Sequence, residues 1–89
     1  MRVLVEPGVS STILDDGSFA VMSERTGKMH LGNSTTSAMW SALVDHDGET
    51  ERAVAAVAAF YGVDPDEVKT DLEHLVGELT QIQLVRTKP

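Results

Sequence analysis

The sequence predicts one α+β domain that is winged-helix-turn-helix-like, with a three-stranded antiparallel sheet followed by three helices. Two observations predict this fold class. The first half of the chain contains short runs rich in β-branched residues, separated by turns that end in glycine. In the second half, apolar residues recur at helical spacing. A length of 89 residues leaves room for one hydrophobic core, so we expect a single domain over residues 1–89.

The three expected strands cover residues 9–14, 18–23 and 28–31. The segments between them, residues 15–17 and 24–27, each end in a glycine, which accepts the positive φ angle that a tight turn needs. Connections this short join neighbouring antiparallel strands, and we therefore expect a meander.

The first two expected helices have recognisable ends. The first begins at Asn33 or Ser34, whose side chains can accept hydrogen bonds from free backbone N–H groups, and it ends in the polar segment 45–48. The second has Thr50 as its expected N-cap, and it ends at Gly62 because glycine favours a helix C-terminus.

The third expected helix has Asp64 as its N-cap and Pro65 at its first position, an order typical of helix starts. After it, the apolar residues 82–85 should return across the core, and residues 2–5 should add a further edge segment to the sheet. The apolar stripe of this helix consists of Val68, Leu72, Leu75, Val76 and Leu79.

Charge and composition exclude several classes of partner. The chain has 14 acidic and 7 basic residues, a net charge of −7, which disfavours nucleic acid and anionic membrane surfaces. The third helix would be the recognition helix of a DNA-binding winged helix, yet it carries many carboxylates and one cation, Lys69. There is no cysteine, no signal segment and no apolar run of membrane-spanning length, so we expect a cytoplasmic protein.

Groups for catalysis or metal binding do not converge in the sequence. Ser10 and Ser11 lack the Gly-x-Ser-x-Gly turn of a nucleophile, and the three histidines have no paired ligand spacing. Residues 45–48 lack the later ligands of a calcium loop, and no glycine-rich phosphate loop is present. We therefore expect no enzyme activity, no catalytic residue, no metal and no cofactor.

Two parts of the chain resemble the PqqD-like family, and together they extend over about residues 9–85. Met29 departs from the pattern, since many relatives have an aromatic residue there. The matching runs are VMSERTGKMHL (residues 21–31), AMWSAL (residues 38–43), FYGVD (residues 60–64), Val68-x-x-Asp71-Leu72-x-x-Leu75 and the terminal Leu84-Val85.

This resemblance implies a recognition element for ribosomally made, modified peptides. Family members bind the leader segment of a precursor peptide in a groove between the third strand and the third helix, and they deliver it to a processing enzyme. The acidic, stand-alone form is similar to the leader-binding proteins of lasso-peptide biosynthesis, where that enzyme is a separate leader peptidase and a cyclase follows. Delivery to another modifying enzyme, or a winged helix that binds DNA or protein, remains an alternative.

The residues themselves favour peptide binding. Residues 28–31 form a short expected edge strand without proline, and such an edge can accept another strand through its unpaired backbone groups. On the third helix we expect the apolar stripe to be shared between core and groove, with Asp71 at its edge facing a cation of the guest. The expected peptide-binding residues are Lys28, Met29, His30, Leu31, Glu67, Val68, Asp71, Leu72, His74 and Leu75.

Overall fold

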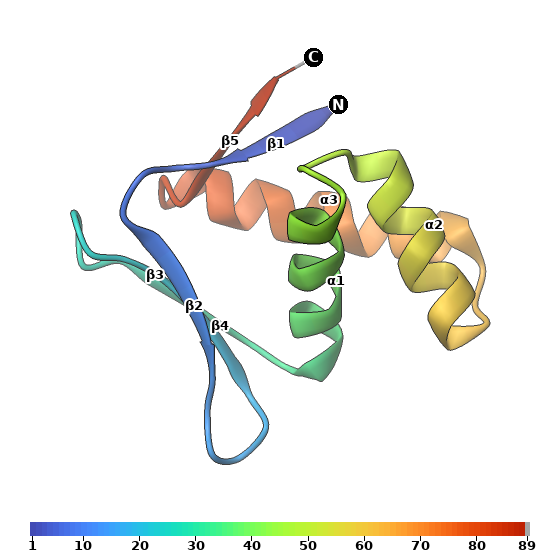
Figure 1. The fold of residues 1–89 in the computed structure, drawn as a ribbon, viewed down its shortest axis with the longest axis horizontal. Coiled ribbons are helices and arrows are strands. Elements are labelled where there is room, and N and C mark those ends of the chain that lie inside the picture. The colour runs from blue at the N-terminus through green and yellow to red at the C-terminus, as the bar shows by residue number, and fades with distance from the viewer. Residues whose placement is uncertain (89) are drawn as a thin grey trace.

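Residues 1–88, which a computed structural model describes, form five strands and three helices (Figure 1). Three antiparallel strands followed by three helices confirm the predicted fold class. The strands are β1 (Arg2–Val5), β2 (Val9–Ile13), β3 (Phe19–Ser23), β4 (Met29–Gly32) and β5 (Val85–Lys88). The helices are α1 (Ser34–Asp45), α2 (Thr50–Tyr61) and α3 (Pro65–Gln81).

The main sheet has the strand order β2-β3-β4, so that β3 is central and β2 and β4 are its edges. Both connecting turns contain a glycine with positive φ, 85° at Gly17 and 75° at Gly27, as the sequence predicts. The register pairs Val21 of β3 with His30 of β4. In Figure 1 the three helices lie together on one side of this sheet.

Two helices begin at the predicted capping residues. The Asn33 side-chain oxygen accepts a hydrogen bond from the Thr36 N–H at 3.0 Å, which fixes the first turn of α1 directly after β4. The Asp64 carboxylate accepts one from the Asp66 N–H at 2.9 Å, and Pro65 is the first residue of α3. Both caps position the two helices that border the candidate site.

The prediction for the start of α2 is wrong by one residue. The N-cap is Glu49, whose side chain makes no capping hydrogen bond, and Thr50 is already helical. The Thr50 hydroxyl instead donates to the carbonyl of Met1 at 3.0 Å, a partner that lies far away in the sequence. The helix ends as predicted at Gly62, which has a φ of 66°.

The hydrophobic core lies between the inner face of the sheet and the helices. Phe19 and Val21 point inward from β3, and the Phe19 ring lies 6.3 Å from that of Trp40 on α1, measured between centroids. Leu79 of α3 is fully buried. The core therefore fixes α1 and α3 relative to β3, and through β3 relative to β4.

The β1 and β5 strands form a second sheet, which the sequence does not predict. β1 pairs antiparallel with β5, so the prediction that residues 2–5 extend the meander is wrong. The cause is the C-terminal segment, where Leu84 and Val85 are buried as predicted and bring β5 alongside β1. Within residues 1–88, no helix has the length and hydropathy needed to cross a bilayer.

Candidate peptide-binding groove between β4 and α3

A groove of about 510 Å³ separates β4 from α3 and continues to the start of α1. Its floor is apolar, because the buried side chains of Met39 and Leu75 reach it from α1 and α3. Its rim is polar and includes two carboxylates. The residues that line it are His30, Leu31, Gly32, Asn33, Thr36, Met39, Thr70, Asp71, His74, Leu75 and Glu78.

The outer edge of β4 borders this groove and pairs with no other strand of the part that the structure describes. The Ser23 N–H donates to the Lys28 carbonyl at 2.9 Å, which directs the backbone of Lys28 towards β3. Because backbone groups alternate along a strand, His30 also faces β3, whereas the N–H and C=O groups of Met29 and Leu31 point away from the sheet. These are the groups that an added strand would use.

One side-chain contact connects β4 and α3 across the groove. His30 Nδ1 lies 3.5 Å from Glu78 Oε2, and this is an ion pair when the imidazole is protonated. The His30 side chain is 17% exposed and that of Glu78 is 56% exposed, so the contact is partly screened by solvent. It marks the end of the groove nearest the C-terminus of α3.

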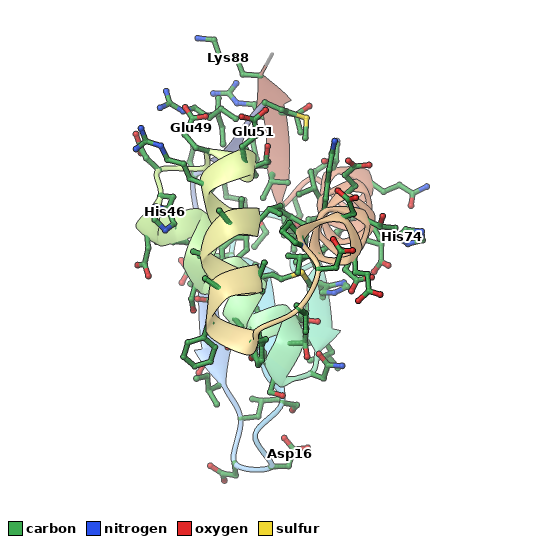
Figure 2. All side chains as sticks on the ribbon, turned by 90° about the vertical axis from the view of Figure 1, so that its right-hand side faces the viewer. Asp16, His46, Glu49, Glu51, His74 and Lys88 are labelled. Carbon is green, nitrogen blue, oxygen red and sulfur yellow. The ribbon has the colours of Figure 1, made fainter. Side chains whose placement is uncertain are left out.

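The α3 side of the groove is a single helical row. Asp71, His74, Leu75 and Glu78 follow the spacing i, i+3, i+4, i+7, and all four line the groove. Figure 2 shows His74 projecting from α3 on the side away from α2. The row combines one buried apolar residue with two exposed carboxylates, so it offers an apolar contact beside negative charge.

The structure brings together half of the peptide-binding residues that the sequence predicts. Those in the groove lining are His30, Leu31, Asp71, His74 and Leu75.

The other five predicted residues lie outside the groove lining. Val68 and Leu72 are buried, and Leu72 borders a different cleft, on the α2 side of α3. Lys28 and Glu67 are exposed but do not reach the groove. Met29 lies on the outer face of the sheet, opposite to His30, because successive side chains of a strand alternate between faces.

The groove also contains residues that are not among those predicted from the sequence. Glu78 lies four residues after His74, and helical spacing places it on the same flank of α3 as Asp71 and His74, although it is not among the expected peptide-binding residues. Gly32, Asn33, Thr36 and Met39 belong to the junction between β4 and α1, and their approach to α3 depends on tertiary packing that has no local signal.

A larger cleft, of about 570 Å³, lies on the other flank of α3. Its apolar surface comes from Val54, Leu72 and Val76, and its rim carries Glu51 and Glu73. It borders α2 and α3 and contains no strand edge of the main sheet. The β4–α3 groove is therefore the better candidate for an extended peptide.

Neither depression coincides with a metal-binding cluster in residues 1–88. In the described part of the chain, no group of three or more His, Asp or Glu side chains is placed to hold a metal ion. Ser18 donates hydrogen bonds to the carboxylate of Asp16, and these hold the pKa of Asp16 below the usual 3.8. Asp16 lies in the turn between β2 and β3, away from the groove (Figure 2). Its titration therefore concerns the turn and not the groove.

Comparison with known proteins agrees with this architecture. The family model described as coenzyme PQQ synthesis protein D (PqqD) matches residues 19–85. The structure titled "TbiB1 in Complex with the TbiA(beta) Leader Peptide" has a TM-score of 0.79 at 24% identity, covering 97% of this chain and 98% of that one. "Lasso peptide synthetase B1 complexed with the leader peptide" has a TM-score of 0.79 at 18% identity, covering 98% of this chain and 100% of that one.

The comparison with curated proteins gives no match. The two solved structures share the fold of this chain, while the family model covers most of its length, including β3, β4 and all three helices. The resemblance noted in the sequence is thus confirmed, and the chain belongs to the PqqD family.

Proposed function

We propose that this chain binds the leader segment of a ribosomally made precursor peptide and presents it to a separate leader peptidase in lasso-peptide maturation. The observation that carries the proposal is the unpaired edge of β4 beside an apolar-floored groove. Membership of the PqqD family supports it, as do two solved neighbours whose titles name leader-peptide complexes.

The guest would bind by β-augmentation. Its backbone would pair with the outward-facing groups of Met29 and Leu31, and these main-chain hydrogen bonds would give affinity independent of the guest sequence. A guest side chain pointing into the groove would contact Leu75, and a neighbouring basic residue would reach Asp71 or Glu78. The groove therefore favours an apolar anchor close to a cation.

This role needs no chemistry from the chain itself. The groove would hold the leader, while the bond to be cleaved lies in the part of the precursor outside it, where a separate peptidase can reach it. A cyclase that acts afterwards is a further expected partner. We assign no catalytic residue and no cofactor to the chain.

DNA binding, the other role expected of a winged helix, finds no support in the charge of α3. Asp66, Glu67 and Glu73 are all exposed on this helix, where they would repel phosphates. Its exposed cation, Lys69, lies among these carboxylates. We therefore retain peptide binding alone.

The direct test begins with a search of the gene neighbourhood for a short precursor frame; its leader peptide is then labelled with fluorescein and titrated with this protein, and binding is followed by anisotropy. We expect saturable binding with a dissociation constant in the micromolar range or below, since ordering a flexible segment offsets roughly 2–5 kcal/mol of the contact energy. The core segment of the same precursor should not bind. A peptidase assay with and without this protein then measures presentation.

A pair of matched variants tests the groove. Asp71→Ala should weaken leader binding several-fold, because it removes a carboxylate from the groove rim. Asp15→Ala, an equal change of charge at the exposed β2–β3 turn, is the control and should bind like the wild type. Equal affinity of both variants would argue against this groove as the binding site.

A further inference from the structure

The outer face of the main sheet, which points away from the helices, carries no charge at its strand positions. Phe19 and Val21 define the inner face, because both are buried against the helices. Alternation along the strands and the pairing register therefore assign the intervening positions to the outer face. These are Ser10, Thr12, Ala20, Met22, Met29 and Leu31.

Three of these outer-face residues form an apolar patch that reaches the β4 edge. Met22 is 38% exposed, and Met29 and Leu31 are 52% and 60% exposed. Met29 is directly opposite Met22, and Leu31 is opposite Ala20, so the three large side chains are cross-strand or diagonal neighbours. In a chain with a net charge of −7, an uncharged apolar surface next to an unpaired edge is unusual.

We infer that this patch is the second half of the leader site, so that a leader strand on β4 is recognised on both faces of the sheet. The inference rests on the proposed function, and it adds a recognition surface outside the groove. Guest residues directly opposite Met29 and Leu31 would lie on the outer face, about 5.5 Å away between Cα atoms. The guest residue between them, opposite His30, would point into the groove.

This geometry sets a pattern for the guest. The two outer-face residues, at i and i+2, are apolar, because they cover Met29 and Leu31 and find no charged partner there. The residue at i+1 enters the groove, where the apolar part of its side chain would contact Leu75 and a basic group would reach Asp71 or Glu78. The class of ligand is thus an extended segment of the form apolar-x-apolar.

The occupant of the patch is the leader strand because the patch is continuous with the edge that the strand would extend. Leu31 belongs to both surfaces, since it lines the groove and lies at an outer-face position. Addition of a strand to β4 necessarily places alternate guest side chains over this patch, whether the guest runs parallel or antiparallel. A second protein need not be invoked to cover it.

The test uses the full chain and the same labelled leader peptide as the titration above. The double variant Met29→Thr/Leu31→Thr removes apolar contact while keeping residues that favour strands. Because roughly half of each side chain is free to be buried by the guest, we expect binding about tenfold weaker or more. Ile13→Thr, on the opposite edge strand and 69% exposed, is the matched control and should bind normally.

A scan of single substitutions along the leader peptide tests whether the leader is recognised on one face of the main sheet or on both. Single Asn substitutions, which add no charge, should weaken binding at the two outer-face positions of the leader, which are separated by one residue. Those two substitutions should cost much less in the Met29→Thr/Leu31→Thr variant, because their partner surface is already lost. Circular dichroism of each variant verifies that the fold is intact.

The outcomes distinguish the proposed leader-binding function from the proposed outer-face site. If the wild type shows no saturable binding, both the proposed function and the two-face site are overturned. If the wild type binds, Asp71→Ala weakens binding and the Met29→Thr/Leu31→Thr variant binds like Ile13→Thr, the groove is retained and the outer-face site is refuted. Weakening by the double variant with the alternating leader pattern supports recognition on both faces.

Discussion

The structure indicates that Gly48, in the connection between α1 and α2, stabilises the domain because no larger residue fits beside β1. Its φ is 80°, and a Cβ atom there would overlap the carbonyl oxygen of Val3 and lie 3.2 Å from the Val3 amide nitrogen. The neighbour is backbone of β1 and cannot rotate away. The Val3 N–H donates to the Gly48 carbonyl at 2.8 Å, and the Gly48 N–H donates to the Leu43 carbonyl at 2.7 Å.

The replacement Gly48→Ala should therefore destabilise the domain by about 3 kcal/mol. The left-handed conformation costs a residue with a Cβ about 1 kcal/mol. Displacing β1 breaks the Val3 hydrogen bond, worth about 1 kcal/mol. It also withdraws Val3, 4% exposed, from the core, which costs about 1 kcal/mol more.

Gly62→Ala provides a matched control for this prediction. Gly62 has a φ of 66°, but a Cβ there would meet nothing within 4 Å, so only the conformational cost of about 1 kcal/mol applies. Urea titration followed by fluorescence of the buried Trp40, the single tryptophan, measures both values. Equal losses of unfolding free energy in the two variants would refute the argument that a Cβ atom at position 48 collides with the backbone of β1.

Three further outcomes follow from local geometry. Gly77→Ala within α3 should raise stability by about 0.5–1 kcal/mol, because a Cβ there meets nothing and alanine favours the helix; thermal unfolding measures it. Asp64→Ala should lower stability by about 1 kcal/mol through loss of the α3 cap, while Asp64→Asn should retain most of it. NMR titration should give Asp16 a pKa below 3.8, so its stabilising contribution is complete above that pH and is lost as the pH falls through the folded-state value; a midpoint at 3.8 or higher would contradict this.

Much of the fold could be predicted because its signals are local. Gly17 and Gly27 mark the turns of the meander, and Asn33 and Asp64 cap their helices as the sequence indicates. The β1–β5 pair could not be predicted, since it joins two four-residue strands from opposite ends of the chain. The sequence predicts Thr50 as a cap because the partner of its hydroxyl, the carbonyl of Met1, is remote in the sequence.

The candidate site was only half predictable for a related reason. The stripe on α3 is wide because this helix packs against both α2 and β5 and also borders the groove, and a sequence pattern does not divide the stripe among these surfaces. Leu75 faces the groove, whereas Leu72 faces the α2 side. Likewise, the pattern places Met29 and His30 on opposite faces of a strand but does not say which face meets the helix.

The central claim is that a guest strand pairs with the outer edge of β4, and hydrogen exchange of individual amides measured by NMR tests it most directly. In the free protein, the N–H groups of Met29 and Leu31 point away from the sheet and should exchange quickly, whereas that of His30 faces β3. Saturation with the leader peptide should slow exchange at Met29 and Leu31 by at least tenfold and leave the outer edge of β2 unchanged. Protection that appears on β2 instead, or unchanged exchange at both β4 amides in the saturated complex, would contradict the account.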